Sequence, residues 1–345
     1  MRVLAGDIGG THTRLALCEL DGGVHILHRE RYLNANAAGL AEHLQTFLGH
    51  LPAPEAACFA VAGPTDGRHA QLTNLAWAID AEALQARFRI PRVRLVNDFR
   101  AVGHGIDAVD PHHLAVLQTG HVVKEAPRVV LGAGSGLGVS LCVWDGRRHQ
   151  PLPSEGGHIG FAPADAEQDR LLAFLRAEYK RASVERILSG PGIVALYRFR
   201  LREAGRNPLE PDTLLHDKLP AAAITQAALA QSEPQAIEAM RLFCRIYGQT
   251  AGDLALLGQA LGGVFIAGGI APKILPLLKH AEFLEGFHAK GRFAEWTRQL
   301  PVSVVLDEDV GLKGAALAAA EPQSDDRASD CFSQTRTPPP KGVSN

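Results

Sequence analysis

The residues near the N-terminus that are best suited to chemistry lie in one turn between two apolar runs. The turn Asp7-Ile8-Gly9-Gly10-Thr11-His12-Thr13-Arg14 joins residues 3–5 to residues 15–18. Two apolar runs joined by a glycine pair are typical of a plain β-hairpin. However, glycines expose backbone N–H groups to phosphate oxygens, and Asp7, Thr11 and Arg14 add a carboxylate, a hydroxyl and a positive charge. These residue types favour an anion-binding loop.

Two further glycine-rich stretches follow apolar runs. Gly132 to Gly138 contains Gly132, Gly134 and Gly136 together with the hydroxyl of Ser135. It resembles a shifted dinucleotide-binding turn, but a strand pattern follows it instead of a long helix. Gly268-Gly269 precedes a helix predicted to start at Ala271-Pro272, and a helix N-terminus favours an anion or a nearby adenosine ribose. A tight strand-to-helix turn is the alternative for this pair.

Asn97-Asp98 directly follows the apolar run 93–96. Both residues are good helix N-caps, which is the structural interpretation. The functional interpretation makes Asp98 a general base at the carboxyl end of a strand, where open α/β sheets usually bind ligands. The residues alone leave both interpretations open.

Glu155-Gly156-Gly157-His158 brings a carboxylate and an imidazole into one short segment. The two glycines make a helix unfavourable, so we expect a loop rather than a helical metal pair, and a metal would need more ligands. Such a loop can bind a polyhydroxy ligand by hydrogen bonds. Glu185 lies in a stretch that reads as an ordinary helix surface with Ser183 as a possible cap, and nothing local distinguishes it.

The elements that must position these residues alternate between strand and helix patterns. Strands are predicted at 3–8, 14–20, 24–31, 56–62 and 93–96, and helices at 38–48, from Asp80 as N-cap to Phe88, and from Asp98 to Val102. The pattern of strand, glycine-rich turn, strand, hairpin and strand recurs at 128–131, 139–144 and 149–152, with a hairpin turn at Asp145-Gly146. We expect mixed sheets covered by helices, with the two glycine-rich turns on facing domains across a cleft.

The second half of the chain is mainly helical. Helices are predicted at 165–178, 192–204, 221–231 and 233–257, then strands at 263–267 and 302–306 and a final helix at 309–320. Beyond Glu321 the composition changes to Ser, Asp, Thr, Pro and Lys, which indicates a disordered tail. A chain of 345 residues is long enough for about two or three domains.

The composition excludes several classes of protein. Hydrophobic residues make up 46% of the chain and the formal charge is −2, so we expect a large core and no basic surface for nucleic acid or anionic membranes. No apolar run approaches the ~20 residues of a membrane span, and no secretory signal is evident. The five cysteines form no C-x-x-C pair, and four lie in apolar runs, which fits buried thiols in a reducing cytoplasm.

Several motifs stand in one order between about Arg2 and Ala320. They are Asp7-x-Gly-Gly-Thr-x-x-Arg14, Ala62-Gly63-Pro64, Thr73-Asn74, Asn97-Asp98-Phe99, Gly132–Gly138, Glu155-Gly-Gly-His158, Glu185–Gly192 and Gly263–Gly269. This ordered set resembles the bacterial glucokinases, the hexokinase-type enzymes of the actin-like sugar kinase superfamily. The resemblance implies an α/β, two-domain actin-like (ribonuclease H-like) ATPase fold with mixed central sheets flanked by helices and an active site in the interdomain cleft. The implied domains are residues 1–108 plus 309–320 (small), 109–308 (large) and a tail at 321–345.

The resemblance also implies an activity and a set of site residues. The activity is ATP-dependent phosphorylation of D-glucose to glucose 6-phosphate, the first step of glycolysis, in a cytoplasmic homodimer. Asp98 would be the catalytic base on the 6-hydroxyl, and Asn97, Glu155, His158 and Glu185 would bind the other glucose hydroxyls. ATP would be held by two phosphate loops and a glycine pair beside the adenosine, and Asp7 would position Mg²⁺ through water. The cofactor-binding residues are Asp7, Gly9, Gly10, Thr11, Arg14, Gly132, Gly134, Ser135, Gly136, Gly268 and Gly269.

Two positions depart from the family pattern. Relatives usually have Asn where this chain has His12, which is bulkier and can titrate near neutral pH, so nucleotide binding could differ. Ser135 replaces a common Thr and keeps the hydroxyl.

Two alternative functions remain open. One is a kinase for another hexose, for N-acetylmannosamine, or with polyphosphate as donor; the cysteine-rich zinc motif of the repressor-related sugar kinases is absent from the sequence. The other is a non-enzymatic sugar sensor, which would place a DNA-binding helix-turn-helix ahead of the kinase domain, whereas the printed sequence starts at the first predicted strand.

Overall fold

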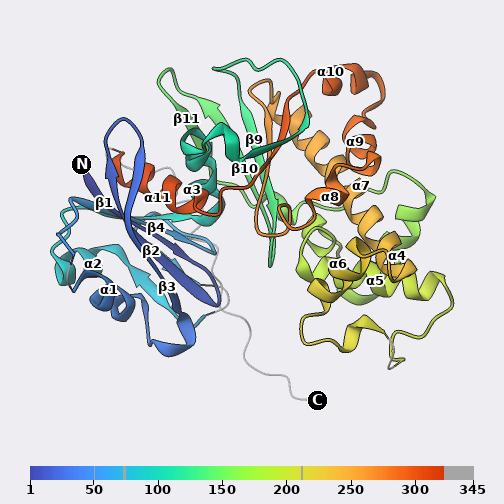
Figure 1. The fold of residues 1–345 in the computed structure, drawn as a ribbon, viewed down its shortest axis with the longest axis horizontal. Coiled ribbons are helices and arrows are strands. Elements are labelled where there is room, and N and C mark those ends of the chain that lie inside the picture. The colour runs from blue at the N-terminus through green and yellow to red at the C-terminus, as the bar shows by residue number, and fades with distance from the viewer. Residues whose placement is uncertain (50, 73–74, 211–212, 322–345) are drawn as a thin grey trace. The chain divides into compact units, whose positions relative to one another are not determined.

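The computed structural model describes the chain except residues 50, 73–74, 211–212 and 322–345 (Figure 1). Thr73-Asn74, Cys331 and the predicted tail beyond Glu321 therefore lie outside the described residues. The chain divides into two compact units. Unit 1 comprises Met1–Ala101 and the segment that starts at Gly311, and unit 2 comprises Val102–Val310.

Unit 1 is built on a five-stranded mixed sheet of order β3-β2-β1-β4-β7, accompanied by a two-stranded ribbon of β5 and β6. Its strands are β1 (Arg2–Ile8), β2 (His12–Leu20), β3 (Val24–Leu33), β4 (Ala56–Val61), β5 (His69–Gln71), β6 (Ala78–Asp80) and β7 (Val93–Asn97). β1, β4 and β7 run parallel, while β2 and β3 are antiparallel to their neighbours. The predicted main strands are confirmed; the ribbon was not predicted.

Helices cover both faces of this sheet. The helices are α1 (Leu40–Leu48), α2 (Ala81–Phe88), α3 (Asp98–Gly105) and α11 (Val310–Ala320). Because side chains alternate along a strand, Leu4 and Ile8 pack with α1 and α2, whereas Val3 and Ala5 pack with the alanine-rich face of α11 (Figure 1). A strand buried on both faces needs a continuous apolar run, as β1 has. The predicted cap is confirmed: Asp80 accepts hydrogen bonds from two N–H groups of α2.

Unit 2 is built on a six-stranded sheet of order β11-β10-β9-β12-β13-β8. Its strands are β8 (Leu114–Gln118), β9 (Arg128–Ala133), β10 (Leu137–Trp144), β11 (His149–Leu152), β12 (Val264–Ala267) and β13 (Val302–Val305). β9, β12 and β13 run parallel, and β10 and β11 lie antiparallel beside β9, as β2 and β3 do beside β1. The predicted recurrence of the strand pattern is therefore confirmed as a recurrence of sheet topology; the edge strand β8 was not predicted.

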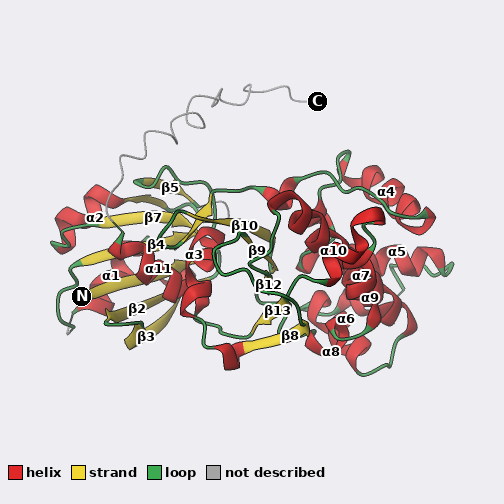
Figure 2. Ribbon diagram, turned by 90° about the horizontal axis from the view of Figure 1, so that it is seen from above, coloured by secondary structure: helices red, strands yellow, loops and turns green. Residues whose placement is uncertain are grey.

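Seven helices of the described residues gather at one end of unit 2 around the long helix α7 (Figure 2). They are α4 (Ala166–Tyr179), α5 (Gly190–Glu203), α6 (Pro220–Leu229), α7 (Pro234–Gly258), α8 (Leu275–Leu278), α9 (Ala281–His288) and α10 (Ala294–Arg298). The four long helices α4, α5, α6 and α7 agree with the predicted segments to within two residues at every end, and α9 and α10 were not predicted. Phe243 and Tyr247 of α7 are fully buried between the neighbouring helices.

The helix predicted to start at Ala271-Pro272 is wrong in its position. Residues 268–274 form turns, and α8 begins only at Leu275. Pro276 has no N–H with which to bond the carbonyl of Pro272, so a regular helix cannot run through this stretch. Gly268-Gly269 therefore does not lie at a helix N-terminus.

The cysteines of the described chain behave as buried apolar side chains. Cys18, Cys58, Cys142 and Cys244 are free and buried. Burial raises the pKa of Cys58 and of Cys142 to about 12, which keeps these thiols protonated and unreactive. Within the described residues, no helix is both long and apolar enough to cross a membrane.

Glu321 belongs to the packed part of unit 1 rather than to a disordered tail. Its carboxylate lies 3.0 Å from Arg94 Nη1, and both side chains are largely buried. This ion pair joins the residue that follows α11 to strand β7.

Glu321→Gln is expected to lower the free energy of unfolding by about 3 kcal/mol, because it removes the carboxylate that neutralises a buried guanidinium. Urea denaturation measures the change. The control is Glu82→Gln, which breaks the exposed Arg68–Glu82 pair and should cost less than about 1 kcal/mol. Equal losses in the two variants would contradict the role given to burial.

Candidate active site

The N-terminal turn of unit 1 is held by an ion pair across two strands. Asp7 of β1 lies opposite Arg14 of β2, and Arg14 reaches Asp7 Oδ2 through Nη2 at 2.5 Å and Nε at 3.2 Å. Gly9 N–H bonds the carbonyl of His12 at 3.0 Å, which closes the turn. The predicted carboxylate and guanidinium are thus brought together.

A cavity of about 350 Å³ opens beside this turn and is lined by Asp7, Gly9, Thr11, His12, Arg14 and Arg31. Its lining holds two arginines and one carboxylate, so the fixed charge favours an anion. Arg31 was not among the predicted site residues. Its Nη2 lies 3.2 Å from Nδ1 of His12.

Asn34 braces the same turn from the other side of the sheet and was also missed. Its amide nitrogen donates to the carbonyl of Gly9 at 2.8 Å, and its amide oxygen accepts the hydroxyl of Thr13 at 2.8 Å. Asn34 is buried, so both bonds are shielded from water. The only sequence signal was a polar residue directly after a strand, the signal that drew attention to Asn97.

Asn97 and Asp98 lie at the junction of β7 and α3. Asn97 Oδ1 accepts the N–H groups of Phe99 and Arg100, at 2.9 and 3.2 Å, so the capping interpretation is confirmed for Asn97. Asp98 Oδ1 accepts the Phe99 N–H at 2.8 Å. Because β1, β4 and β7 are parallel and in register, Asp98 and the cavity turn share the carboxyl edge of the unit 1 sheet.

In unit 2, the turn between β9 and β10 receives bonds from distant segments. The N–H of Gly134 donates to the carbonyl of Gly136, and the carbonyl of Gly134 accepts a hydrogen bond from the N–H of Gly190. The carbonyl of Ala133 accepts a hydrogen bond from the N–H of Ile270, which follows Gly268-Gly269. The second glycine-rich turn and the glycine pair therefore meet within one unit.

Glu185 is attached to this turn, contrary to the expectation of an ordinary helix surface. Its Oε2 accepts the N–H of Leu137 at 3.0 Å. A Cβ added at Gly136 would lie 2.6 Å from the same oxygen, so the absence of a side chain there lets Glu185 approach. The local segment is a single 3-10 turn, Val184–Arg186, which Ser183 does not cap; Ser189 caps α5 instead.

Glu155 and His158 complete a cluster with Glu185. The segment forms a 3-10 turn over Gly156–His158 rather than the expected irregular loop. The two ring nitrogens of His158 lie 3.9 Å from Glu155 Oε2 and 3.9 Å from Glu185 Oε1, too far for direct hydrogen bonds. All three side chains keep exposed surface, so they offer acceptors and ring nitrogens to a polyhydroxy ligand.

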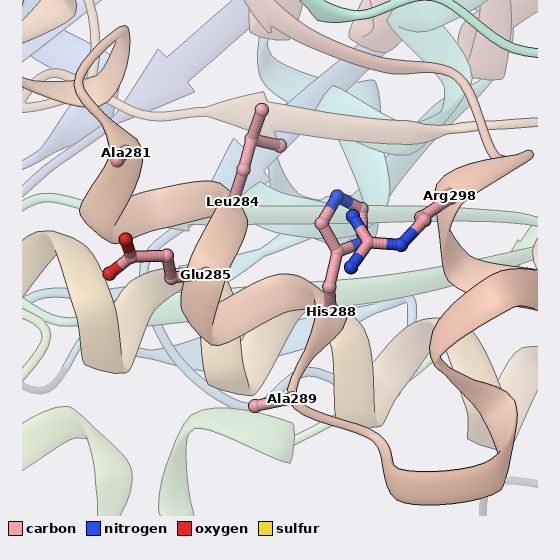
Figure 3. A pocket seen from close by; sticks show the side chains of 6 residues that line it. All are labelled: Ala281, Leu284, Glu285, His288, Ala289 and Arg298. Atoms are coloured by element: carbon pink, nitrogen blue, oxygen red, sulfur yellow. The ribbon is translucent and has the colours of Figure 1, made fainter.

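A second cavity of about 520 Å³ contains none of the predicted residues. It is lined by Ala281, Leu284, Glu285, His288, Ala289 and Arg298 (Figure 3). His288 and Arg298 lie against each other, and Glu285 points away from them. Burial, with Arg298 nearby, lowers the pKa of His288, so its imidazole stays neutral. This cavity is separate from the candidate site.

Comparisons with known proteins agree over most of the chain. The sequence model of the family described as Glucokinase matches residues 4–322. A glucokinase from Nostoc punctiforme is 43% identical over 337 residues, which cover 92% of this chain and 98% of that protein. A glucokinase from Photorhabdus laumondii is 39% identical, with coverage of 90% and 95%. The solved structure of a glucokinase from an Antarctic psychrotroph has a TM-score of 0.81 and 31% identity, with coverage of 92% and 98%.

Gly157→Ala is expected to lower the free energy of unfolding by about 2–3 kcal/mol, because its Cβ would lie 2.1 Å from the backbone oxygen of Leu137. Equilibrium denaturation measures this. Gly134→Ala is the matched control, since a Cβ there meets no atom within 4 Å, and should change stability by less than about 1 kcal/mol. If Gly157→Ala is as stable as the control, the packing of these two segments is misassigned.

Proposed function

Because the chain belongs to the glucokinase family and phosphorylates glucose with ATP, we propose that Asp98 is the general base of the transfer. The observation that carries the proposal is the position of Asp98 on the carboxyl edge of the unit 1 sheet, the edge that also holds the cationic cavity turn. A base and a site for a phosphate donor are the two groups that the reaction requires of the protein.

Asp98 takes the proton of the glucose 6-hydroxyl as the hydroxyl oxygen attacks the terminal phosphorus of ATP, and the bond from that phosphorus to the β-phosphate oxygen breaks to release ADP. The hydroxyl loses its proton late in phosphoryl transfer, so a well-placed carboxylate suffices. The Phe99 N–H holds Oδ1 of Asp98, which orients the carboxylate. Alignment of the glucose 6-hydroxyl with the terminal phosphate of ATP then contributes most of the remaining rate enhancement.

The other glucose hydroxyls bind to Asn97, Glu155, His158 and Glu185. Asn97 uses its amide oxygen to cap α3, so its amide nitrogen is the donor for the sugar. Glu185 is held through Oε2 by Leu137, so its Oε1 is the acceptor for the sugar. Carboxylates accept hydroxyl hydrogen bonds strongly, which favours a sugar over a less polar substrate.

The two glycine turns hold the phosphates of ATP, and Gly268-Gly269 borders the adenosine. In unit 1 the ligands are Gly9, Gly10, Thr11 and Arg14. In unit 2 the phosphates lie at Gly132, Gly134, Ser135 and Gly136, where the glycines leave the backbone open and Ser135 and Gly136 offer their N–H groups. Within the described chain, the N–H groups of Ser135 and Gly136 have no protein partner, whereas those of Ala133, Gly134 and Leu137 are already bonded.

The cavity lining suits Mg²⁺ only when the ion enters already bound to the phosphates of ATP. Asp7 is the one carboxylate of the cavity lining, and Arg14 already engages its Oδ2. Mg²⁺ keeps several waters and needs few protein carboxylates, so Asp7 can hold it through water. When bound, the ion would neutralise charge on the transferred phosphoryl group.

Asp98→Asn is expected to lower kcat by about 100- to 10,000-fold, because an amide cannot take the proton. The dissociation constant for glucose should change by less than about threefold, since Asn keeps an oxygen for the Phe99 N–H. A coupled assay for glucose 6-phosphate and calorimetric titration with glucose measure the two quantities. Asp80→Asn, at the cap of α2, is the matched control with unchanged kcat. Near-normal turnover in Asp98→Asn would exclude Asp98 as the base.

Gly136→Ala is expected to raise the KM for glucose by about tenfold, because the new Cβ displaces the carboxylate of Glu185. The displaced atom ends a flexible side chain, so the free energy of unfolding should fall by less than about 1 kcal/mol. Glu185→Gln should raise the same KM without a steric change. Unaltered glucose kinetics in both variants would refute the role of Glu185.

A further inference from the structure

Arg31 lies in a row of charged residues that crosses three strands of unit 1. Asp7 of β1 pairs in register with Arg14 of β2, and Arg14 pairs in register with Arg31 of β3. Residues directly opposite in a sheet share a face, so the three side chains line the cavity together. The order across the sheet is one carboxylate followed by two arginines.

This row leaves a positive charge facing the cavity. The two contacts from Arg14 engage Asp7, so the single carboxylate balances one of the two guanidinium groups. Within the described residues, the side chain of Arg31 has one polar partner, His12, which carries no negative charge. Like charges directly opposite in a sheet destabilise it. An anion between the two arginines removes that repulsion.

His12 orients the guanidinium of Arg31. An arginine can only donate hydrogen bonds, so Nδ1 of His12 is the acceptor in this contact. His12 also lines the cavity. The histidine therefore acts as a positioning residue for Arg31.

We propose that Arg31 is a further ligand of the phosphate chain of the nucleoside triphosphate, aimed into the cavity by His12. The inference rests on the proposed function of the Asp7–Arg14 turn as a donor site. A guanidinium presents several donors in a fixed plane and matches phosphate oxygens better than an ammonium does. Because Arg14 is paired with Asp7, Arg31 supplies the positive charge that is left to balance the phosphates.

The test is calorimetric titration of the full chain with Mg·ATP in the absence of glucose. Arg31→Gln should raise the dissociation constant by about 3- to 10-fold, Arg31→Glu by more, and Arg31→Lys by less. Arg68→Gln, which removes an exposed arginine of unit 1 outside the cavity, is the charge-matched control and should leave ATP affinity unchanged. The dissociation constant for glucose should stay the same in every variant.

Two further readouts separate ligand binding from a structural role. The melting temperature of the ligand-free Arg31 variants should stay constant or rise, and Arg31→Glu should rise most, because Glu can pair with Arg14. His12→Ala should weaken ATP binding less than Arg31→Gln does, and the double variant should bind no more weakly than Arg31→Gln alone.

The outcomes distinguish this inference from the function on which it rests. If the wild-type chain does not bind Mg·ATP, the donor site and the role of Arg31 both fail. If the wild type binds but Arg31→Gln and Arg31→Glu bind equally well, only the role of Arg31 fails. A lowered melting temperature with unchanged ATP affinity would make Arg31 a structural residue.

Discussion

The turn between β9 and β10 has to present a nearly bare backbone, because other segments of unit 2 pack directly on it. Glu185 takes the Leu137 N–H, Gly190 donates to the carbonyl of Gly134, and Gly157 passes too close to Leu137 for a Cβ. These contacts fix the carboxylate of Glu185 at the turn. The cluster of Glu155, His158 and Glu185, proposed to bind the sugar, and the turn are therefore packed together, and a disturbance of either moves the other.

In unit 1 the turn between β1 and β2 is held by charged and polar side chains rather than by close backbone packing. This turn lies beside a cavity and is stabilised by the Asp7–Arg14 pair and by Asn34 from behind. At the end of β7, Asn97 caps α3 and so fixes the first residue of that helix, Asp98. The cap and the proposed base are adjacent residues, so the capping interpretation does not compete with the catalytic one.

Sequence reasoning succeeded where the signal was local. Apolar runs predicted the strands of both sheets except β8, and Asp80 marked the start of α2, because hydrophobic periodicity and capping depend on neighbouring residues. The local pattern wrongly predicted an ordinary helix surface at Glu185, since the N–H that holds its carboxylate belongs to Leu137, 48 residues away. The sequence does not single out Arg31, because its position beside Arg14 depends on the register of β2 with β3. The helix after Gly269 begins later than Pro272 predicts, because Pro276 has no N–H to continue a helix started there.

The shared topology of the two sheets, typical of the actin-like ATPase fold of the glucokinase family, does not carry the chemistry of their turns. In unit 1 the turn is surrounded by two arginines and one carboxylate, which suits a polyanion. In unit 2 the side chains beside the turn are a histidine and two carboxylates, and the carboxylates repel a phosphate but accept sugar hydroxyls. Under the proposed function, a phosphate at the unit 2 turn relies on backbone N–H groups, and among the described residues those of Ser135 and Gly136 have no protein partner. The same strand-turn-strand frame thus carries a cationic cavity in unit 1 and an anionic cluster in unit 2: the charges of unit 1 lie on the strands of the frame, whereas those of unit 2 come from segments outside it.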